Sequence, residues 1–197
     1  MGGGTIARGC VGKGRHIASP HPPYLNQLTL PVTSHPTYNI LIICHANTSR
    51  SVMAHALLEK MLADRGVSHV NVRSGGIAIY ARDRMLSSLD ARLVLRDVGI
   101  HINDGEFVST DLKRHRHLIE QAHLILAMTN EQKQMLEAYP EATGKPAFTL
   151  REFAGEAGDI EDPAMQGDEV FRARLDEIQH CLEKSFDHLL RLSHEHI

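Results

Sequence analysis

The 197-residue sequence has no tryptophan, few other aromatic residues and few cysteines. Its three cysteines, Cys10, Cys44 and Cys181, form no even and closely spaced framework, which excludes a disulfide-rich secreted scaffold. The longest strongly apolar run, residues 40–44, is far shorter than the ~18–20 residues of a membrane-spanning helix. Lys and Arg number 21 against 24 Asp and Glu, and a net charge of −3 gives no long-range attraction to nucleic acid or anionic membranes. We therefore expect a cytoplasmic protein that binds neither nucleic acid nor membrane.

The first 37 residues differ in composition from the rest of the chain. They hold six of the 15 glycines and five of the eight prolines, and their charged residues are Arg8, Lys13 and Arg15. They lack both the apolar periodicity that would offset the entropy of ordering and the apolar core of a secretory signal. The composition predicts a disordered extension at 1–37 and a folded domain at 38–197. A weakly basic arm that binds a partner is the alternative for the extension.

Beyond the extension, short apolar stretches alternate with helical patterns. Strand patterns occur at 39–44, 70–73, 123–128 and 147–153, and helical patterns at 51–65, 86–98, 111–121, 131–139 and 168–188. Gly66 and Gly99 stand where a left-handed residue is expected to end a helix, and Asn130 is expected to cap the helix that follows it. Strands that alternate with helices predict an α/β fold whose parallel sheet is covered by helices on both faces.

The junction between the first strand and the first helix carries a chemical pattern. The strand ends at Cys44, and Arg50 follows after five small or turn-tolerant residues: His45, Ala46, Asn47, Thr48 and Ser49. A loop of this length can direct successive backbone N–H groups at a tetrahedral oxyanion, and the helix N-terminus and the arginine add positive charge. In that field we expect Cys44 to be a thiolate that can attack phosphorus. The pattern predicts a phosphate-binding loop with a cysteine nucleophile, and an ordinary strand–helix turn is the alternative.

Phosphoryl transfer also needs a proton for the leaving group. Asp162 precedes Pro163 in a glycine-rich, acidic loop that follows the fourth predicted strand. This loop leaves the same carboxyl edge of the sheet, so the aspartate can reach the phosphate loop as general acid and then as general base. Asp159 and Glu161 are rivals for that role on sequence alone.

Four segments together resemble the low-molecular-weight protein-tyrosine phosphatase family: 44–54 (CHANTSRSVMA), 72–76 (VRSGG), 124–129 (LILAMT) and Asp162-Pro163. They follow the family's order and spacing over about residues 39–190. The resemblance implies a three-layer α/β/α fold with a four-stranded parallel sheet. It also implies a two-step hydrolysis that uses no metal or cofactor, acts on phosphorylated protein and releases inorganic phosphate.

The same resemblance implies a role for each matching residue. Cys44 would take the phosphoryl group, Arg50 would stabilise the transition state, and Asp162 would protonate the leaving group and then activate water. Three polar side chains would hold the loop from behind, with the second of them bonded to the thiolate: Asn47, Ser51 and Ser74.

Thr48, Tyr80 and Ala164 are expected to set the substrate specificity. Ala164 stands where the family usually has an aromatic ring, so one wall of an aryl-phosphate slot is missing, and Tyr80 is the candidate for the opposite wall. Thr48 resembles the corresponding residue of a subgroup that dephosphorylates protein arginine, and its hydroxyl can meet a guanidinium-like leaving group. The sequence leaves phosphotyrosine and phosphoarginine equally open.

Two other functions remain as alternatives. An oxyanion-binding module without turnover is favoured by Ala164 and by Ala46, which would strain the loop if its position required a positive φ. A thiol-linked arsenate reductase would need a further cysteine near the site, whereas Cys10 lies in the extension and Cys181 in the last predicted helix. Paired histidines at 115/117 and 194/196 are interpreted as surface residues, because alternate positions on a helix face different ways. We therefore expect no metal site.

Overall fold

The computed structural model describes residue 1 and residues 37–196, so almost all of the predicted extension lies outside the described residues. The described chain contains one sheet of four parallel strands in the order β2-β1-β3-β4. The strands are β1 (Tyr38–Cys44), β2 (Val70–Gly76), β3 (Leu124–Ala127) and β4 (Ala147–Thr149). The predicted α/β fold and its four-stranded parallel sheet are therefore confirmed.

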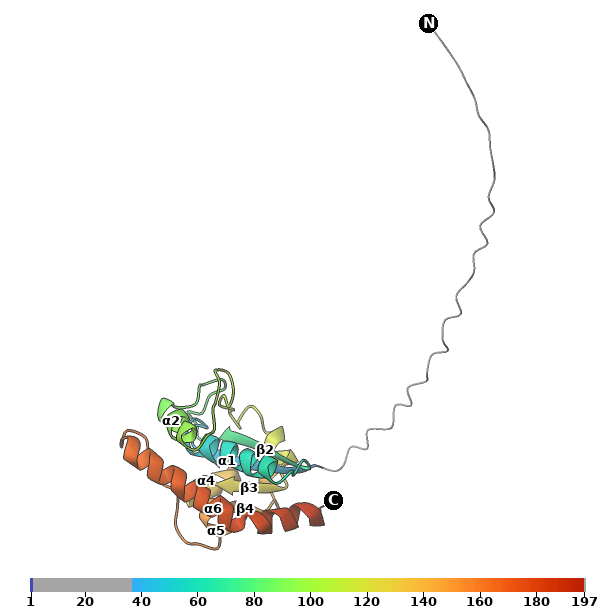
Figure 1. The fold of residues 1–197 in the computed structure, drawn as a ribbon. Helices are drawn as coiled ribbons and strands as arrows, with labels where there is room; N and C mark the ends of the chain where they lie inside the picture. Colours follow the sequence, from blue (N-terminus) through green and yellow to red (C-terminus); the bar gives the residue numbers. More distant parts are fainter. Residues whose placement is uncertain (2–36, 197) are drawn as a thin grey trace. The chain divides into compact units, whose positions relative to one another are not determined.

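Helices cover both faces of this sheet (Figure 1). They are α1 (Arg50–Asp64), α2 (Leu89–Asp97), α3 (His117–Gln121), α4 (Asn130–Met135), α5 (Leu150–Phe153) and α6 (Asp168–Glu195), with the 3₁₀ turns η1 (Leu136–Ala138) and η2 (Pro140–Ala142). Gly66 and Gly99 have φ values of 66° and 80° just after α1 and α2, as predicted. The long α6 contacts α1, α2 and α5 on the same side of the sheet.

Alternate residues of β1 enter two separate hydrophobic cores. Ile40 and Ile42 pack into the core formed with α1, α2, α5 and α6. Leu41 and Ile43 point the opposite way, into the core shared with α3 and η1. Because successive side chains of a strand alternate between the faces of a sheet, one continuous apolar run fills both layers. Each such buried side chain contributes about 1.5–3 kcal/mol of hydrophobic free energy.

Two predicted elements were wrong in type over part of their length. The predicted strand 147–153 is a strand only to Thr149, where a reciprocal cap between Thr149 and Glu152 begins α5. The predicted helix 111–121 is helical only from His117, and Asp111 instead forms an isolated parallel bridge with Gly76. A local cap overrides the ambiguous apolar pattern in the first segment, and a long-range pairing with β2 does so in the second.

Other elements were predicted with shifted ends. β2 continues past residue 73 to Gly76, and α6 continues past residue 188 to Glu195. The helix expected at 131–139 is α4 followed by η1, and its N-cap is Thr129, not Asn130. The helix expected at 86–98 begins at Leu89, because Ser88 caps it.

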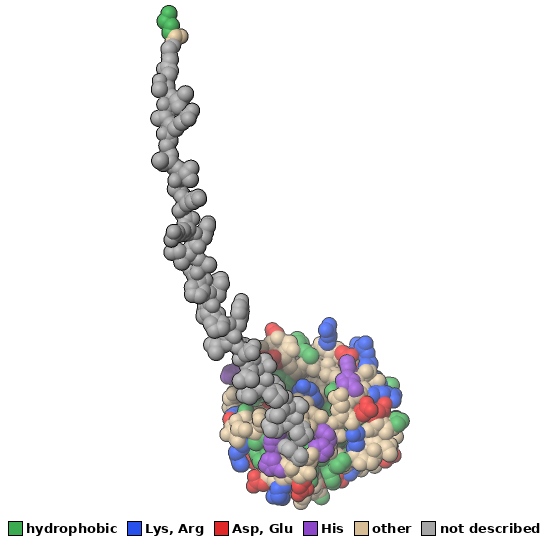
Figure 2. Space-filling model, turned by 90° about the vertical axis from the view of Figure 1, so that its right-hand side faces the viewer, with side chains coloured by type: hydrophobic (Ala, Val, Ile, Leu, Met, Phe, Trp, Pro, Cys, Tyr) green, Lys and Arg blue, Asp and Glu red, His purple; other side chains and the backbone are tan. Residues whose placement is uncertain are grey.

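The surface of the described chain carries charges of both signs. Figure 2 shows a face on which basic, acidic and histidine side chains are interspersed. Within residues 37–196, no helix has the length and apolarity that crossing a membrane requires. At the carboxyl edge of the sheet, the last residue of β1 lies beside the last residue of β2, and this edge carries the residues singled out from the sequence.

Candidate active site

Cys44 is the last residue of β1, and its thiol lies under the loop formed by residues 45–49. The residue is 3% exposed. Its Sγ accepts a hydrogen bond from the backbone N–H of Asn47 at 3.2 Å and lies 2.9 Å from the Oγ of Ser51. One contact comes from the loop and the other from the first turn of α1. Donors placed on two sides of the sulfur stabilise a thiolate.

Asn47 turns the loop and holds it. Among residues 45–49, all of which the structure describes, Asn47 is the one with a positive φ, 59°. Its Nδ2 donates to the Oγ of Ser51 at 2.9 Å, and its Oδ1 accepts from the backbone N–H of Thr110 at 2.9 Å. The condition for strain at Ala46 is therefore not met, because the left-handed residue of this loop is an asparagine, which tolerates that conformation.

Gly76 lets β2 approach the loop closely, a role that the sequence reasoning missed. Gly76 is the register partner of Cys44. A Cβ placed on Gly76 would lie 2.8 Å from the backbone carbonyl carbon of Ala46. Any side chain at this position would therefore displace the loop. The Gly75-Gly76 pair at the end of a strand pattern was the available signal of a close backbone approach.

Ser88 supports the loop from its outer side and was also missed. Its backbone N–H donates to the carbonyl oxygen of Thr48 at 2.8 Å, and its Oγ lies 2.9 Å from the Oγ of Ser49. Ser88 is also the N-cap of α2, with its Oγ accepting from the N–H of Ala91. A serine before a helical pattern signals a cap, but nothing local in the sequence indicates the contact with the loop.

Arg50 opens α1 and is 2% exposed. Its Nη1 donates to the carbonyl oxygen of Ile160 at 2.9 Å, and its Nη2 donates to the Oδ2 of Asp162 at 2.5 Å. Both partners belong to the loop that follows α5. The guanidinium is thus fixed in advance, as transition-state stabilisation of an oxyanion requires.

Asp162 is the acid that contacts the arginine. Its side chain is 49% exposed, and its Oδ1 accepts from the backbone N–H of Ala164 at 3.1 Å. The rival Asp159 accepts from the backbone N–H of Asn130 at 2.9 Å, so it caps the start of α4. The other rival, Glu161, lines a separate hollow with Asp159. Of the three acids, Asp162 is the one with a partner in the phosphate-loop region.

Two rings and a carboxylate lie next to one another beside the phosphate loop, and we call this group of Tyr80, His45 and Glu131 the mouth of the site. Tyr80 is 61% exposed. Partial burial raises the pKa of its phenol, the negative charge of Asp162 raises it further, and Arg50 opposes the rise. The His45 ring lies 6.4 Å from the Tyr80 ring, and the His45 Nε2 lies 3.5 Å from a carboxylate oxygen of Glu131. Tyr80 therefore stands within electrostatic reach of the predicted catalytic residues.

The remaining residues predicted for the site are Thr48, Ala164 and Ser74, and they differ in how directly they contact the phosphate loop. Thr48 is partly buried within the loop, and Ala164 is exposed beside the acid. The hydroxyl of Ser74 pairs with the Nδ1 of His55 in α1 at 3.0 Å. Ser74 thus reaches the loop only through α1, and its role in holding the loop stays a prediction.

The paired histidines make ordinary local contacts. His115 lies 3.1 Å from Asp83, and its ring meets the His117 ring edge-on at 5.8 Å. The two rings were expected to face different ways, but His115 precedes α3 and is not on it. The C-terminal pair packs against other histidines: His194 on His69 and His196 on His123. Residues 37–196 contain no group of three His, Cys, Asp or Glu side chains that could hold a metal ion.

Cys181 lies in the middle of α6 and is fully buried. Burial raises the pKa of its thiol, with Glu156 adding to the rise. A thiol in such surroundings is unreactive. Cys10, the other cysteine that a reductase could use, lies outside the described residues.

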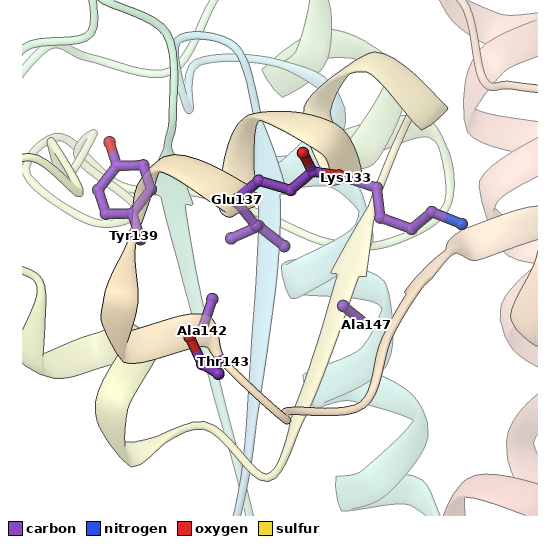
Figure 3. Close-up of a pocket in the computed structure, with 7 residues that line it drawn as sticks. Lys133, Glu137, Tyr139, Ala142, Thr143 and Ala147 are labelled. Carbon is purple, nitrogen blue, oxygen red and sulfur yellow. The ribbon is translucent and has the colours of Figure 1, made fainter.

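A cavity of about 380 Å³ lies between α4, η1, η2 and the start of β4 (Figure 3). It is lined by Lys133, Leu136, Glu137, Tyr139, Ala142, Thr143 and Ala147. None of these residues belongs to the phosphate loop or the acidic loop, so the chemistry is assigned to the network around Cys44 and not to this cavity.

The network combines three chemical groups at one edge of the sheet. Cys44 offers a thiol that can act as a nucleophile, Arg50 a fixed cation and Asp162 a partly exposed carboxyl group. A thiolate under a loop of backbone donors can attack phosphorus, and a nearby acid can protonate what leaves. The arrangement is therefore suited to phosphoryl transfer through a cysteine.

Comparison with known proteins points to one family. Residues 39–195 match the family described as low molecular weight phosphotyrosine protein phosphatase. A protein-arginine-phosphatase of Geobacillus stearothermophilus is 38% identical over 149 residues, which cover 75% of this chain and 93% of that protein.

Two solved structures of arginine phosphatases share the fold. The YwlE arginine phosphatase from Geobacillus stearothermophilus superposes with a TM-score of 0.69 at 37% identity, covering 81% of this chain and 97% of that one. A YwlE arginine phosphatase with a cysteine-to-serine substitution, described as carrying a phosphorylated active-site serine, gives a TM-score of 0.69 at 31% identity. That match covers 78% of this chain and 99% of the other.

Proposed function

This chain belongs to the low-molecular-weight protein-tyrosine phosphatase family, and we propose from that premise that its preferred substrate is phosphoarginine in proteins. It is a cysteine-dependent protein phosphatase. The observation that carries the substrate assignment is Thr48, a β-branched hydroxyl residue in the phosphate loop. The 38% identity with a protein-arginine-phosphatase supports the same assignment.

Thr48 is held in a fixed position at the entrance to the loop. Its carbonyl oxygen accepts a hydrogen bond from the backbone N–H of Ser88. The hydroxyl of the next residue, Ser49, is hydrogen-bonded to the hydroxyl of the same serine. A β-branched side chain has restricted rotation at χ1 and narrows the entrance, and its hydroxyl can accept a hydrogen bond from a guanidinium N–H. Ala164 leaves the other side without an aromatic wall, which disfavours a flat phenyl ring.

The proposed reaction has two steps. The Cys44 sulfur attacks phosphorus, the P–N bond breaks, and Asp162 gives its proton to the departing guanidine nitrogen. Water then attacks the phosphocysteine, the S–P bond breaks, Asp162 takes the proton from the water, and inorganic phosphate leaves. Arg50 and the loop amides stabilise the charge on the phosphoryl oxygens in both steps.

The phosphorylated active-site serine of the cysteine-to-serine arginine phosphatase supports a covalent intermediate at the position of Cys44. The 2.9 Å contact between Ser51 Oγ and Cys44 Sγ supports the role of the thiolate as attacking and leaving group. The contact of Asp162 with Arg50 supports the position of this carboxyl group beside the phosphate loop, where the acid must lie. A thiolate nucleophile needs a reducing compartment, so we also propose that the protein works in the cytoplasm.

The test is phosphate release from two peptides that differ only in carrying phosphoarginine or phosphotyrosine. We expect kcat/KM to be about ten-fold or more higher for phosphoarginine, and Cys44→Ser to abolish turnover of both peptides. Thr48→Val keeps the shape and removes the hydroxyl, so it should lower kcat/KM about ten-fold for phosphoarginine only. A wild-type preference for phosphotyrosine would overturn the substrate assignment.

Phosphotyrosine is the second candidate, because Tyr80 stands at the mouth and can stack on an aryl ring. Preference for phosphotyrosine, with a loss in Tyr80→Ala, would establish it. Release from neither peptide, together with phosphopeptide binding by Cys44→Ser, would instead identify an oxyanion-binding module.

A further inference from the structure

Glu131 is a carboxylate at the mouth of the site that the proposed reaction does not use. It lies in the first turn of α4, directly after β3, the strand that pairs with β1. Both strands therefore deliver residues to the same carboxyl edge of the sheet. One Glu131 carboxylate oxygen lies 3.5 Å from the Nε2 of His45, the residue that follows the nucleophile. Glu131 thus reaches across from α4 to the phosphate loop.

The negative charge of Glu131 acts on Tyr80, the other exposed residue of the mouth. It is one of the negative charges that raise the pKa of the Tyr80 phenol, together with Asp162 and Cys44. The ring of Tyr80 also faces the His45 ring across 6.4 Å. Glu131, His45 and Tyr80 therefore form one group of neighbouring side chains beside the phosphate loop.

Three acids near the site are held by permanent partners within the protein. Asp162 is bonded to Arg50, Asp159 accepts from a backbone N–H, and Glu152 is paired with Lys133. The partner of Glu131 is a histidine, which is charged only when protonated, and the Glu131 side chain is 72% exposed. Glu131 is therefore the mouth carboxylate that an incoming cation can bind.

We propose that Glu131 recognises the guanidinium group of the substrate and so selects phosphoarginine over phosphotyrosine. This inference rests on the proposed function. Phosphoarginine keeps a guanidinium beside the phosphoryl group, and its leaving group is a full guanidinium cation, whose planar N–H fork matches a carboxylate. The phenol that leaves phosphotyrosine carries no positive charge. A carboxylate at this position can therefore form an ion pair with phosphoarginine but not with phosphotyrosine.

The test compares Glu131→Gln with Glu137→Gln, which removes the same charge from an exposed glutamate that borders the cavity of Figure 3. With the phosphoarginine peptide, Glu131→Gln should raise KM about two- to five-fold and leave kcat nearly unchanged, as expected for an exposed charge pair. With p-nitrophenyl phosphate its KM should not rise. Glu137→Gln should behave as wild type with both substrates. A Glu131→Gln enzyme with unchanged KM, or with the same change for both substrates, would overturn the inference while leaving the phosphatase assignment intact.

A competition assay separates this inference from the proposed function. Hydrolysis of p-nitrophenyl phosphate is measured with an unphosphorylated arginine peptide and with the same peptide containing neutral citrulline. Wild type should be inhibited more strongly by the arginine peptide, and Glu131→Gln should lose that difference. If wild type fails to cleave phosphoarginine, the substrate assignment falls, yet this assay still decides whether Glu131 binds guanidinium. Equal inhibition of wild type and Glu131→Gln by the arginine peptide would show that Glu131 does not bind guanidinium.

Discussion

Ser51 contacts both Cys44, the proposed nucleophile, and Asn47, the residue that turns the phosphate loop. Its Oγ lies 2.9 Å from the Cys44 sulfur and accepts from the Asn47 side chain. Ser51→Ala should lower kcat about ten-fold or more, because the sulfur loses a donor and a buried amide loses its acceptor. Pre-steady-state phosphate release measures this effect. Ser185→Ala, which removes a buried hydroxyl bonded to a carbonyl within α6, is the matched control and should leave kcat unchanged. Equal activity in the two variants would contradict the role of Ser51.

The loss of activity on substituting Asp162 should be larger for substrates with poorer leaving groups. Asp162→Asn removes the proposed proton donor, so kcat/KM for phenyl phosphate should fall by roughly 10²–10⁴-fold, with a much smaller loss for p-nitrophenyl phosphate. Asp159→Asn keeps an oxygen that can accept from the Asn130 N–H and serves as the control. A large leaving-group effect in Asp159→Asn and none in Asp162→Asn would move the acid to Asp159.

The residues of the site differ in how far the sequence could predict them. Cys44 and Arg50 belong to one short loop, so their spacing alone indicates that they lie together. Gly76, Ser88 and Glu131 come from three other segments and meet the loop only because the parallel sheet brings its strand ends to one edge. No local pattern reports such contacts, because each of these residue types is common at strand and helix ends.

At the scale of elements, the fit between β2 and the phosphate loop predicts a clear mutational contrast. Gly76→Ala would place a Cβ 2.8 Å from the backbone of Ala46, so the loop must shift and activity should fall at least ten-fold. Gly144→Ala is the control, because Gly144 has a φ of 74° and no atom within 4 Å of an added Cβ. It should cost about 1 kcal/mol of stability and leave kcat unchanged. Parallel urea unfolding and kinetics check both; an active Gly76→Ala enzyme would show that the close approach is unimportant.

The elements themselves were predictable where the apolar pattern is strong. The run 40–44 is continuous and rich in isoleucine, and it forms most of β1, one of the two inner strands of the sheet. The segment 150–153 is equally compatible with strand and helix, and the cap between Thr149 and Glu152 decides for a helix. That cap is visible in the sequence as a threonine followed three residues later by a glutamate, although the apolar residues around it also fit a strand.

At the scale of the whole molecule, the two ends of the sheet carry different chemistry. The carboxyl end holds the phosphate loop, whereas the other end holds aromatic contacts of Tyr38 with two histidines, His123 and His196. The backbone N–H of Asn39 at the start of β1 donates to the Nδ1 of His123 at 2.8 Å. A ring nitrogen accepts a hydrogen bond only when it is unprotonated, so this end of the fold requires a neutral His123.

That requirement predicts a loss of stability in mild acid. Burial lowers the pKa of His123 below its usual 6.5, and the positive charges of His196 and Lys145 lower it further. Burial, with His194, acts in the same direction on His69. The unfolded chain therefore binds protons more readily than the folded chain. The free energy of unfolding keeps its full contribution from these histidines above the ordinary histidine pKa and falls as the pH drops below that pKa. The urea midpoint should therefore be lower at pH 5 than at pH 7.5.

His123→Asn isolates this contribution. An asparagine oxygen can take the place of Nδ1 as acceptor for the Asn39 N–H and does not titrate, so the fall in urea midpoint between pH 7.5 and pH 5 should become smaller. His101→Asn, at an exposed position, is the control and should keep the full fall. Carboxylates whose pKa values are lowered by partners, such as Glu152 beside Lys133, stay ionised at pH 5 and do not contribute. An identical pH dependence in His123→Asn and wild type would show that the acid sensitivity arises elsewhere in the fold.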